Sequence, residues 1–268
     1  MKIAILGAGK MGAWLARELA HDHVVAVHDR DPAKAGSCGG VIWLPSVPDL
    51  AEFRPDIFLN AVSLPETMAA FQSSSAWLDS SCLFADVASI KGDLPAYYAE
   101  CGHPFVSVHP MFGPTFSDWA DLGDENAVVI SESDGEGARL FRALFARLGV
   151  RVFEFSFAEH DRMMAYSLSV PFVASLVFAT GLDATAVPGT TFARHLKIAK
   201  GLLSEDDHLL AEILFNPFSL PQLEKVTANL EYFKHIIAAR DYEEAGKLFD
   251  RLRKNVGPVP TAEPKTTN

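Results

Sequence analysis

Two short segments of the chain carry side chains that could do acid–base chemistry. Ser89 follows the apolar run 83–87, and His109 follows the apolar run 105–108 and precedes Pro110. An imidazole whose pKa lies near neutrality can accept a proton from an alcohol while a hydride leaves the same carbon atom. A serine hydroxyl can orient such a ring or cap the helix that comes next, and the two roles can coexist. We predict that His109 is the catalytic group and that Ser89 assists it.

Two more polar residues lie where a substrate could meet them. Lys91 comes two positions after Ser89 and could hold a substrate carboxylate or lie on the surface. His160 stands between two carboxylates in the first turn of a predicted helix that begins after Ser156. Because this helix opens a new region of the chain, His160 could face a crevice between domains, where sites often form. The alternative is that the acidic neighbours only favour the helix start.

A cluster of cations near residue 194 suggests an anionic ligand. The segment 189–197 holds an arginine, a histidine and a lysine at the start of a predicted helix. Cations at the N-terminus of a helix interact unfavourably with the helix dipole unless a carboxylate lies nearby. Arg194 is the best bidentate clamp for such an anion, and Thr191 and His195 join it as substrate-binding candidates. A salt bridge to a partner chain or a solvated surface is the alternative.

The first residues contain a glycine motif of the type that binds dinucleotides. Gly7-Ala8-Gly9-Lys10-Met11-Gly12 has the pattern G-x-G-x-x-G, follows a predicted strand and opens a predicted helix. Gly7 would permit the tight turn, Gly9 the close approach of a pyrophosphate, and Gly12 the packing of helix on strand. The free amides at the helix start would then face the phosphates. We therefore predict a dinucleotide here, with Lys10, Met11 and Ser63 among its contacts.

The residues after the second predicted strand bear on which dinucleotide binds. Asp29 is placed to accept hydrogen bonds from the adenosine ribose, and its carboxylate would repel a 2′-phosphate. Arg30 could instead pair with that phosphate, or it could be a solvated surface charge. The sequence favours NAD, with NADP less favoured.

These candidate residues need a sheet that brings them to one edge. Apolar runs at 2–6, 24–28, 41–44, 57–62, 83–87, 105–108, 127–130 and 152–155 alternate with helical patterns. Such alternation predicts a parallel sheet covered by helices on both faces, a Rossmann-type doubly wound α/β fold. Ligands of these sheets bind outside the carboxyl ends of the strands, where the glycine loop, Ser89 and His109 are all expected.

The pattern changes to helices alone after residue 155. Ser156 and Glu159 have the spacing of a capping box. We predict a dinucleotide-binding domain at 1–155, an all-helical domain at 156–256, and a flexible tail at 257–268. The stretch 163–182 carries no charge and is long enough to span a bilayer, but its serines and Pro171 favour a helix buried in a core or a subunit interface over a membrane contact.

Composition excludes several other classes of protein. The chain has 268 residues with a net charge of −11, so a nucleic-acid partner is disfavoured. Three cysteines without a CxxC pair indicate reduced thiols, and no secretory signal is present, so we expect a cytoplasmic protein. No Cys/His metal-binding spacing occurs, and we propose no metal.

At this point the residues carry a resemblance to a known family. The chain is similar to the prephenate/arogenate dehydrogenases of tyrosine biosynthesis over nearly its whole length, to about residue 255. The ordered segments that carry the similarity are Gly7 to Gly12, Ala88-Ser89-Ile90-Lys91, His109-Pro110-Met111-Phe112-Gly113-Pro114, Glu159-His160-Asp161 and Gly201 to Asp207. Many dehydrogenases share the glycine motif, whereas the histidine segment preceded by Ser-Ile-Lys is far more specific.

The resemblance implies an NAD(P)-dependent oxidative decarboxylation of a dianionic substrate. It implies that His109 accepts a hydrogen bond from the ring alcohol, that Ser89 orients His109 and the nicotinamide, and that His160 lines the pocket. An arginine of the helical domain would bind the side-chain carboxylate, and Arg194 is the candidate, with His195 or Lys197 as alternatives. The family's helical domains intertwine in a homodimer, so the resemblance implies that 156–256 is a substrate and dimerisation domain. We expect no mutase or amino-acid-sensing module here.

Two other classes of function remain open at this stage. A pyrroline-carboxylate reductase or a β-hydroxyacid dehydrogenase would suit residues 2–12 equally well, but neither explains the His109 segment. A non-catalytic nucleotide-sensing module is the third reading. Prephenate and arogenate both stay open as the substrate.

Overall fold

The computed structural model describes residues 1–37, 39–113, 121–183, 185 and 187–257. The chain forms two compact units, Met1–Ser219 and Leu220–Asn268. The last strand ends at Phe155, where the sequence pattern also changes. The predicted division into domains at residue 155 stays a prediction. Of the predicted tail, all but Gly257 lies outside the described residues, as does Cys38, while Cys82 and Cys101 are free thiols.

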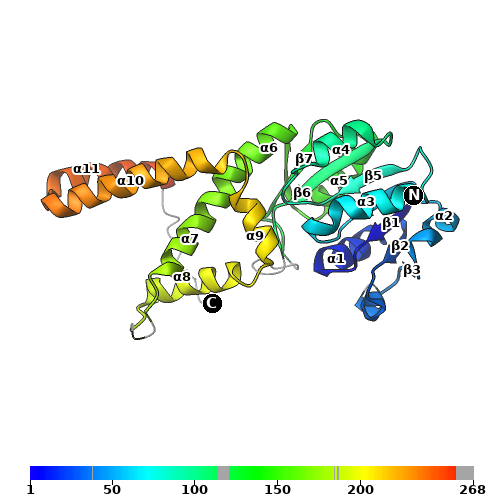
Figure 1. Cartoon of the computed structure of the whole chain (residues 1–268), viewed down its shortest axis with the longest axis horizontal. Coiled ribbons are helices and arrows are strands. Elements are labelled where there is room, and N and C mark those ends of the chain that lie inside the picture. Colours follow the sequence, from blue (N-terminus) through cyan, green and yellow to red (C-terminus); the bar gives the residue numbers. More distant parts are fainter. Residues whose placement is uncertain (38, 114–120, 184, 186, 258–268) are drawn as a thin grey trace, which may run out of the picture. The chain divides into compact units, whose positions relative to one another are not determined.

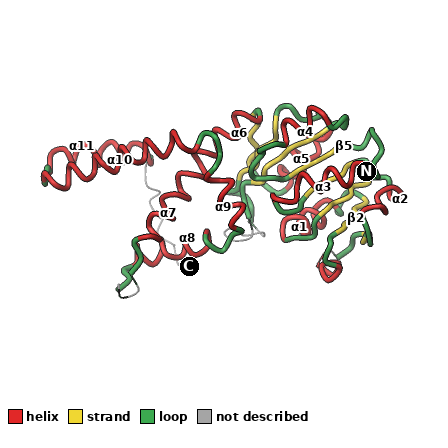
Figure 2. Tube along the Cα trace, in the orientation of Figure 1, coloured by secondary structure: helices red, strands yellow, loops and turns green. Residues whose placement is uncertain are grey.

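The first unit is built on an eight-stranded sheet with the order β3-β2-β1-β4-β5-β6-β7-β8. The strands are β1 (Lys2–Leu6), β2 (Val24–His28), β3 (Ile42–Trp43), β4 (Ile57–Asn60), β5 (Leu83–Asp86), β6 (Phe105–Pro110), β7 (Asn126–Ile130) and β8 (Arg151–Phe155). The predicted α/β fold is confirmed. Figure 2 shows the strands as a yellow layer with helices around it.

One feature of the sheet differs from the expected parallel arrangement. β6 and β7 pair antiparallel, with His109 opposite Val128, whereas the other neighbouring pairs are parallel. A parallel pair needs a crossover of a dozen or more residues, usually a helix. The described residues between β6 and β7, 111–113 and 121–125, contain no helix. The sheet is therefore mixed, and the expectation of a wholly parallel sheet was wrong.

Helices cover both faces of this sheet and bury its central apolar strands, whereas the edge strands β3 and β8 are partly exposed (Figure 1). On one face, α1 (Lys10–Leu19) and α5 (Gly135–Arg147) pack Trp14 and Phe141 against the strands. On the other, α3 (Thr67–Ser75), α4 (Leu94–Glu100) and the short α2 (Leu50–Phe53) contribute Phe71, Tyr98 and Leu50. A strand that is buried on both faces consists of consecutive apolar residues, so such runs in the sequence were enough to predict where these strands lie.

The helical part of the first unit follows β8 directly. It contains α6 (Phe157–Met164), a π-helical turn (Ala165–Ser169), α7 (Val170–Thr180), α8 (Thr190–Leu202) and α9 (Asp207–Leu214). The predicted capping box is confirmed. The Ser156 hydroxyl accepts a hydrogen bond from the Glu159 amide, and the Glu159 carboxylate accepts one from the Ser156 amide. The π-helical turn precedes Pro171, which has no N–H to donate to the carbonyl of residue 167.

The joined helix α6–α7 is more exposed than expected. Phe157–Thr180 has a mean hydropathy of 1.6 over its most apolar window, and 17% of that window is buried. By length and composition alone it could cross a membrane, which is weak evidence, because helices of soluble proteins meet the same criterion. Most of this helix is therefore not buried by the rest of the described chain. The expectation that it lies in the protein's own core was wrong.

The second unit is a helical hairpin. It consists of α10 (Ser219–Ala239), whose first residue belongs to the first unit, and α11 (Tyr242–Val256). Asp241 caps α11 by accepting a hydrogen bond from the Glu244 amide at 2.9 Å. The Tyr232 hydroxyl donates to the Glu244 carboxylate, and Ile236 and Leu248 are buried.

Candidate active site

The glycine loop between β1 and α1 has the backbone geometry that a dinucleotide requires. Gly7 has φ +101°, and a Cβ built there would lie 2.6 Å from the Ala61 carbonyl oxygen. A Cβ on Gly12 would lie 2.0 Å from the Gly7 oxygen, whereas one on Gly9 would meet nothing within 4 Å. The predicted conformational reasons for Gly7 and Gly12 are therefore confirmed. The open space over Gly9, at the start of α1, fits a pyrophosphate group.

Asp29 lies directly behind this loop. Its carboxylate accepts hydrogen bonds from the amides of Ala8, at 2.7 Å, and Asp31, at 2.9 Å. The Lys34 ammonium lies 3.1 and 3.2 Å from the two carboxylate oxygens. Burial alone would raise the pKa of Asp29, but the hydrogen bonds from Asp31, Ala8 and Lys34 outweigh it and lower that pKa. The carboxylate is therefore ionised and fixed beside the glycine loop, as a ribose site requires.

The other cofactor candidates surround the loop less closely. Arg30 forms an exposed ion pair with Glu66 at 3.2 Å. Ser63 is exposed and precedes the turn Leu64–Glu66, while Lys10 is exposed at the start of α1 and Met11 packs against the core. Their contacts with a cofactor stay predictions.

His109, at the end of β6, pairs with His160 of α6. The His109 Nδ1 atom lies 3.0 Å from Nε2 of His160, and His160 Nδ1 lies 3.0 Å from a carboxylate oxygen of Asp161. His160 is completely buried and His109 is 6% exposed. The structure thus brings together two residues that the sequence placed 51 positions apart.

This chain of contacts determines which nitrogen of each ring carries the proton. The Asp161 carboxylate can only accept, so Nδ1 of His160 donates to it. A neutral His160 then accepts at Nε2, and Nδ1 of His109 must be the donor. The remaining nitrogen of His109, Nε2, therefore has a lone pair. Asp161 thus orients a base at the carboxyl end of β6.

The environment keeps His109 neutral. Burial lowers the pKa of His109 well below its ordinary value, and the neighbouring His160 and the Lys91 ammonium lower it further. Burial also lowers the pKa of His160, and Lys91 adds to this, although the hydrogen bond to Asp161 opposes it. The unprotonated imidazole is the form that accepts a proton from an alcohol.

Lys91 has a different place from the expected one. Its ammonium donates to the Asp86 carboxylate and to the Val108 carbonyl, both at 2.8 Å, and its side chain is 0% exposed. The Tyr98 hydroxyl donates to the other Asp86 oxygen at 2.8 Å. Lys91 therefore does not present its charge to an open cleft. It ties the loop after β5 to the residue just before His109.

The other sequence candidates are less directly connected to His109. Ser89 is half-buried, and the hydrogen bonds between described residues do not join it to His109, whose Nδ1 is taken by His160. Arg194, Thr191 and His195 are exposed on α8. Nδ1 of His195 bonds the Thr191 carbonyl at 3.0 Å, and its ring lies 5.7 Å from that of Phe178. Their roles toward a substrate stay predictions.

Sequence reasoning missed several residues that shape the site. Asp161 was quoted in the motif, but its role depends on the contact between His109 and His160. Asn216 donates to the Asp161 carbonyl at 2.8 Å, and no pattern in the sequence signals this contact. Lys34 could have been noticed as a cation five residues after Asp29. Among the described residues, no group of His, Cys, Asp or Glu is arranged to hold a metal ion.

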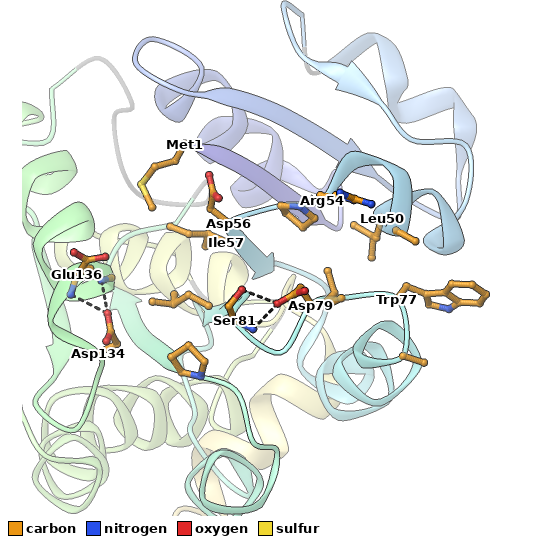
Figure 3. Close-up of a pocket in the computed structure, with 17 residues that line it drawn as sticks. Met1, Leu50, Arg54, Asp56, Ile57, Trp77, Asp79, Ser81, Asp134 and Glu136 are labelled. Atoms are coloured by element: carbon orange, nitrogen blue, oxygen red, sulfur yellow. Dashed lines mark hydrogen bonds between the residues drawn. The ribbon is translucent and has the colours of Figure 1, made fainter.

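Two cavities lie near the sheet, at opposite ends of its strands. One of about 970 Å³ is lined by residues at the starts of β4 and β5, including Asp56, Ile57 and Leu83, and by Asp134 and Glu136 (Figure 3). That edge is opposite to the one that holds the glycine loop. A smaller cavity of about 330 Å³ is lined by the loops after β4 and β5 and by His208 and Glu212 of α9. The smaller one adjoins the edge where ligands of such sheets bind.

Comparison with known proteins identifies relatives over the whole chain. No protein-family model matches. Arogenate dehydrogenase 2, chloroplastic, of Arabidopsis thaliana is 28% identical over 280 aligned positions, which cover 100% of this chain and 76% of that protein. Arogenate dehydrogenase 1, chloroplastic, of the same plant is 27% identical over 87% of this chain, which spans 39% of the relative's length.

A solved structure agrees in fold. Prephenate dehydrogenase from Aquifex aeolicus, crystallised with hydroxyphenyl propionate and NAD+, matches with a TM-score of 0.80 and 17% identity, covering 96% of this chain and 97% of the other. The similarity to the first plant enzyme extends over the whole chain. It therefore includes the segments that form the glycine loop, the buried histidine pair and the mixed sheet. The chain is therefore similar in sequence to plant arogenate dehydrogenases and similar in fold to a prephenate dehydrogenase.

Proposed function

We propose that the protein is an NAD-dependent dehydrogenase that oxidises and decarboxylates prephenate to 4-hydroxyphenylpyruvate, or arogenate to tyrosine. The observation that carries this proposal is the ordered contact of Asp161, His160 and His109 at the carboxyl end of β6. The glycine loop and Asp29 would hold the dinucleotide near this edge. Bound NAD supplies the hydride acceptor.

In the proposed reaction, His109 does the work of a base. Its Nε2 accepts the proton of the ring alcohol while the hydride leaves the same carbon, which turns the alcohol into a ketone. The ring carboxylate then leaves as carbon dioxide, and the electrons of the broken C–C bond aromatise the ring. The former ketone oxygen takes back one proton and becomes a phenol. His160 and Asp161 hold the ring of His109 in place, with its Nδ1 donating to His160, while Nε2 carries the proton.

The substrate needs further anchors, because either candidate carries two carboxylates and the chain is acidic. Lys91 is occupied by Asp86, so we propose Arg194, with Thr191 and His195 beside it on α8, for the side-chain carboxylate. Arg194 is exposed and can form the bidentate contacts that a carboxylate prefers. Ser89, half-buried in the loop after β5, is proposed to contact the nicotinamide end of the cofactor.

We also propose that two copies of the chain form a homodimer through their helical parts. Large apolar side chains are exposed on α7, on α8 and around them: Tyr166, Val177, Leu182, Ile198 and Phe215. Exposed apolar area of this kind marks an interaction surface. A second copy would cover it in a cytoplasmic enzyme. Analytical ultracentrifugation should show a dimer, whereas a monomer that sediments with lipid vesicles would favour a membrane contact.

The reaction is tested by following NADH absorbance with prephenate and with arogenate in separate assays. Turnover of either substrate, with 4-hydroxyphenylpyruvate or tyrosine as the product, supports the proposal. An absence of turnover with both, in protein that binds NADH, would exclude it. The reductase and nucleotide-sensing readings would then be the ones to pursue.

A further inference from the structure

The junction between α9 and α10 is tied to α6 by a buried asparagine. Asn216 is 6% exposed, and its Nδ2 donates to the Asp161 carbonyl at 2.8 Å. Its Oδ1 accepts from the Phe218 amide at 2.9 Å, which fixes the direction in which the side-chain amide points. Burial of an amide is unfavourable unless it is hydrogen-bonded, and here both ends are. An apolar side chain would fill this place without that requirement, so the hydrogen bonds rather than the packing distinguish Asn216.

The bond from Asn216 is not needed to form α6. The Asp161 carbonyl also accepts from the amide of Ala165 within the helical segment, and a carbonyl oxygen has two lone pairs. Asn216 therefore adds a second contact to a main-chain group whose local bond is already made. This contact comes from 55 positions along the chain, and it restrains the main chain of Asp161.

A restraint on Asp161 matters to the proposed reaction. The Asp161 side chain is 21% exposed, so water can compete with Nδ1 of His160 for its carboxylate. That carboxylate lies 3.0 Å from Nδ1 of His160, and the contact determines the tautomer of His160 and, through it, that of His109. A small displacement of a group that orients a base can lower a rate strongly.

We propose that Asn216 is a positioning residue for the base of the reaction. It holds the main chain of Asp161 so that the carboxylate stays on His160, and His160 on His109. The inference rests on the proposed function, and it adds the junction between α9 and α10 to the parts of the chain that orient His109.

Two buried serines at the same junction provide a matched control. The Ser169 hydroxyl donates to the Ile213 carbonyl at 2.9 Å, and the Ser219 hydroxyl donates to that of Ser169 at 2.8 Å. The hydrogen bonds between described residues do not join either serine to Asp161. Loss of the Ser219 hydroxyl therefore disturbs the junction without removing the contact with α6.

The kinetic test is kcat in the NADH absorbance assay, with the Kd for NADH and the melting temperature measured on each variant. Asn216→Ala removes the contact, whereas Asn216→Asp keeps an acceptor for the Phe218 amide and loses the donor to Asp161. Both should lower kcat about tenfold or more, while the Kd for NADH changes less than about threefold. Ser219→Ala should lower the melting temperature and leave kcat within about threefold of the wild type. Wild-type kcat in both Asn216 variants would overturn the inference.

A double-mutant cycle separates positioning from general support of the fold. If Asn216 acts through Asp161, adding Asn216→Ala to Asp161→Asn should lower kcat by no more than about threefold beyond Asp161→Asn alone. Losses that multiply in the double variant would show that Asn216 acts independently of Asp161, which contradicts the inference.

A second readout does not need turnover. The ¹⁵N resonances of the His160 ring, in protein labelled at histidine, report which nitrogen carries the proton. In the wild type this should be Nδ1, and Asn216→Ala should move the proton partly or wholly to Nε2, whereas Ser219→Ala should not. An unchanged His160 ring in Asn216→Ala would refute the positioning role. Wild-type protein that turns over neither substrate would remove the proposed function, and these resonances would then decide the role of Asn216 by themselves.

Discussion

The substitution Asp161→Asn tests whether the two hydrogen bonds from His109 to His160 and from His160 to Asp161 orient His109. The carboxylate accepts from Nδ1 of a completely buried His160, at 3.0 Å. An amide in its place is uncharged, and it can also turn its NH₂ group toward that nitrogen. In that case His160 would carry its proton on Nε2 and donate to His109, and the lone pair of His109 would move to Nδ1.

The size of the expected effect follows from the interaction that is lost. A hydrogen bond to a charged group contributes about 1.5–3 kcal/mol, which corresponds to about a 10- to 100-fold fall in kcat. The full change of tautomer would bring the loss closer to that of removing a general base, about 10²–10⁴-fold. The KM for substrate and the Kd for NADH should change little, because Asp161 contacts neither in the proposed mechanism.

Glu159 provides a matched control on the same helical turn. Its carboxylate accepts from the Ser156 amide and hydroxyl, both at 2.8 Å, and takes no part in the contact with His160. Glu159→Gln should lower the free energy of unfolding by at most about 1 kcal/mol, as expected for a weakened cap, and leave kcat unchanged. A kcat for Asp161→Asn within threefold of the wild type would refute the orienting role of Asp161.

Four further predictions address other parts of the account. Because burial, His160 and Lys91 lower the pKa of His109, kcat/KM should be constant near neutral pH and fall only in acid, with an inflection below 6.5; a fall that begins above pH 7 would contradict this. Lys91→Met should lower the free energy of unfolding by about 3–5 kcal/mol in urea titrations, because it leaves Asp86 charged and buried. Arg194→Ala should mainly raise the KM for substrate, and an unaltered KM would show that another cation binds the carboxylate. Asp29→Ala should relax the preference for NADH over NADPH, and a variant as selective as the parent would argue against its ribose role.

Much of the fold could be predicted because each buried strand corresponds to a run of consecutive apolar residues in the sequence. The runs at 2–6 and 24–28 became β1 and β2 with the expected limits, since strands covered on both faces are continuously apolar. The antiparallel pairing of β6 and β7 could not be predicted in this way. It depends on the connection between the strands, and β7 has the same apolar composition whichever way it runs.

The site was predictable only where a residue's role depends on its immediate neighbours. The glycine loop met that condition, because a positive φ and a close approach restrict single positions. The place of Lys91 did not, since a lysine is usually exposed and its burial depends on Asp86, Tyr98 and the Val108 carbonyl meeting around it. The pairing of His109 with His160 likewise joins residues far apart in the chain.

The central claim is that Nε2 of His109 accepts the proton of the substrate alcohol. The most direct test is the kcat of His109→Ala in the NADH absorbance assay, with NADH binding measured on the same protein by fluorescence. The account predicts a fall in kcat of about 100-fold or more, with NADH affinity retained. A kcat close to that of the wild type would contradict the claim.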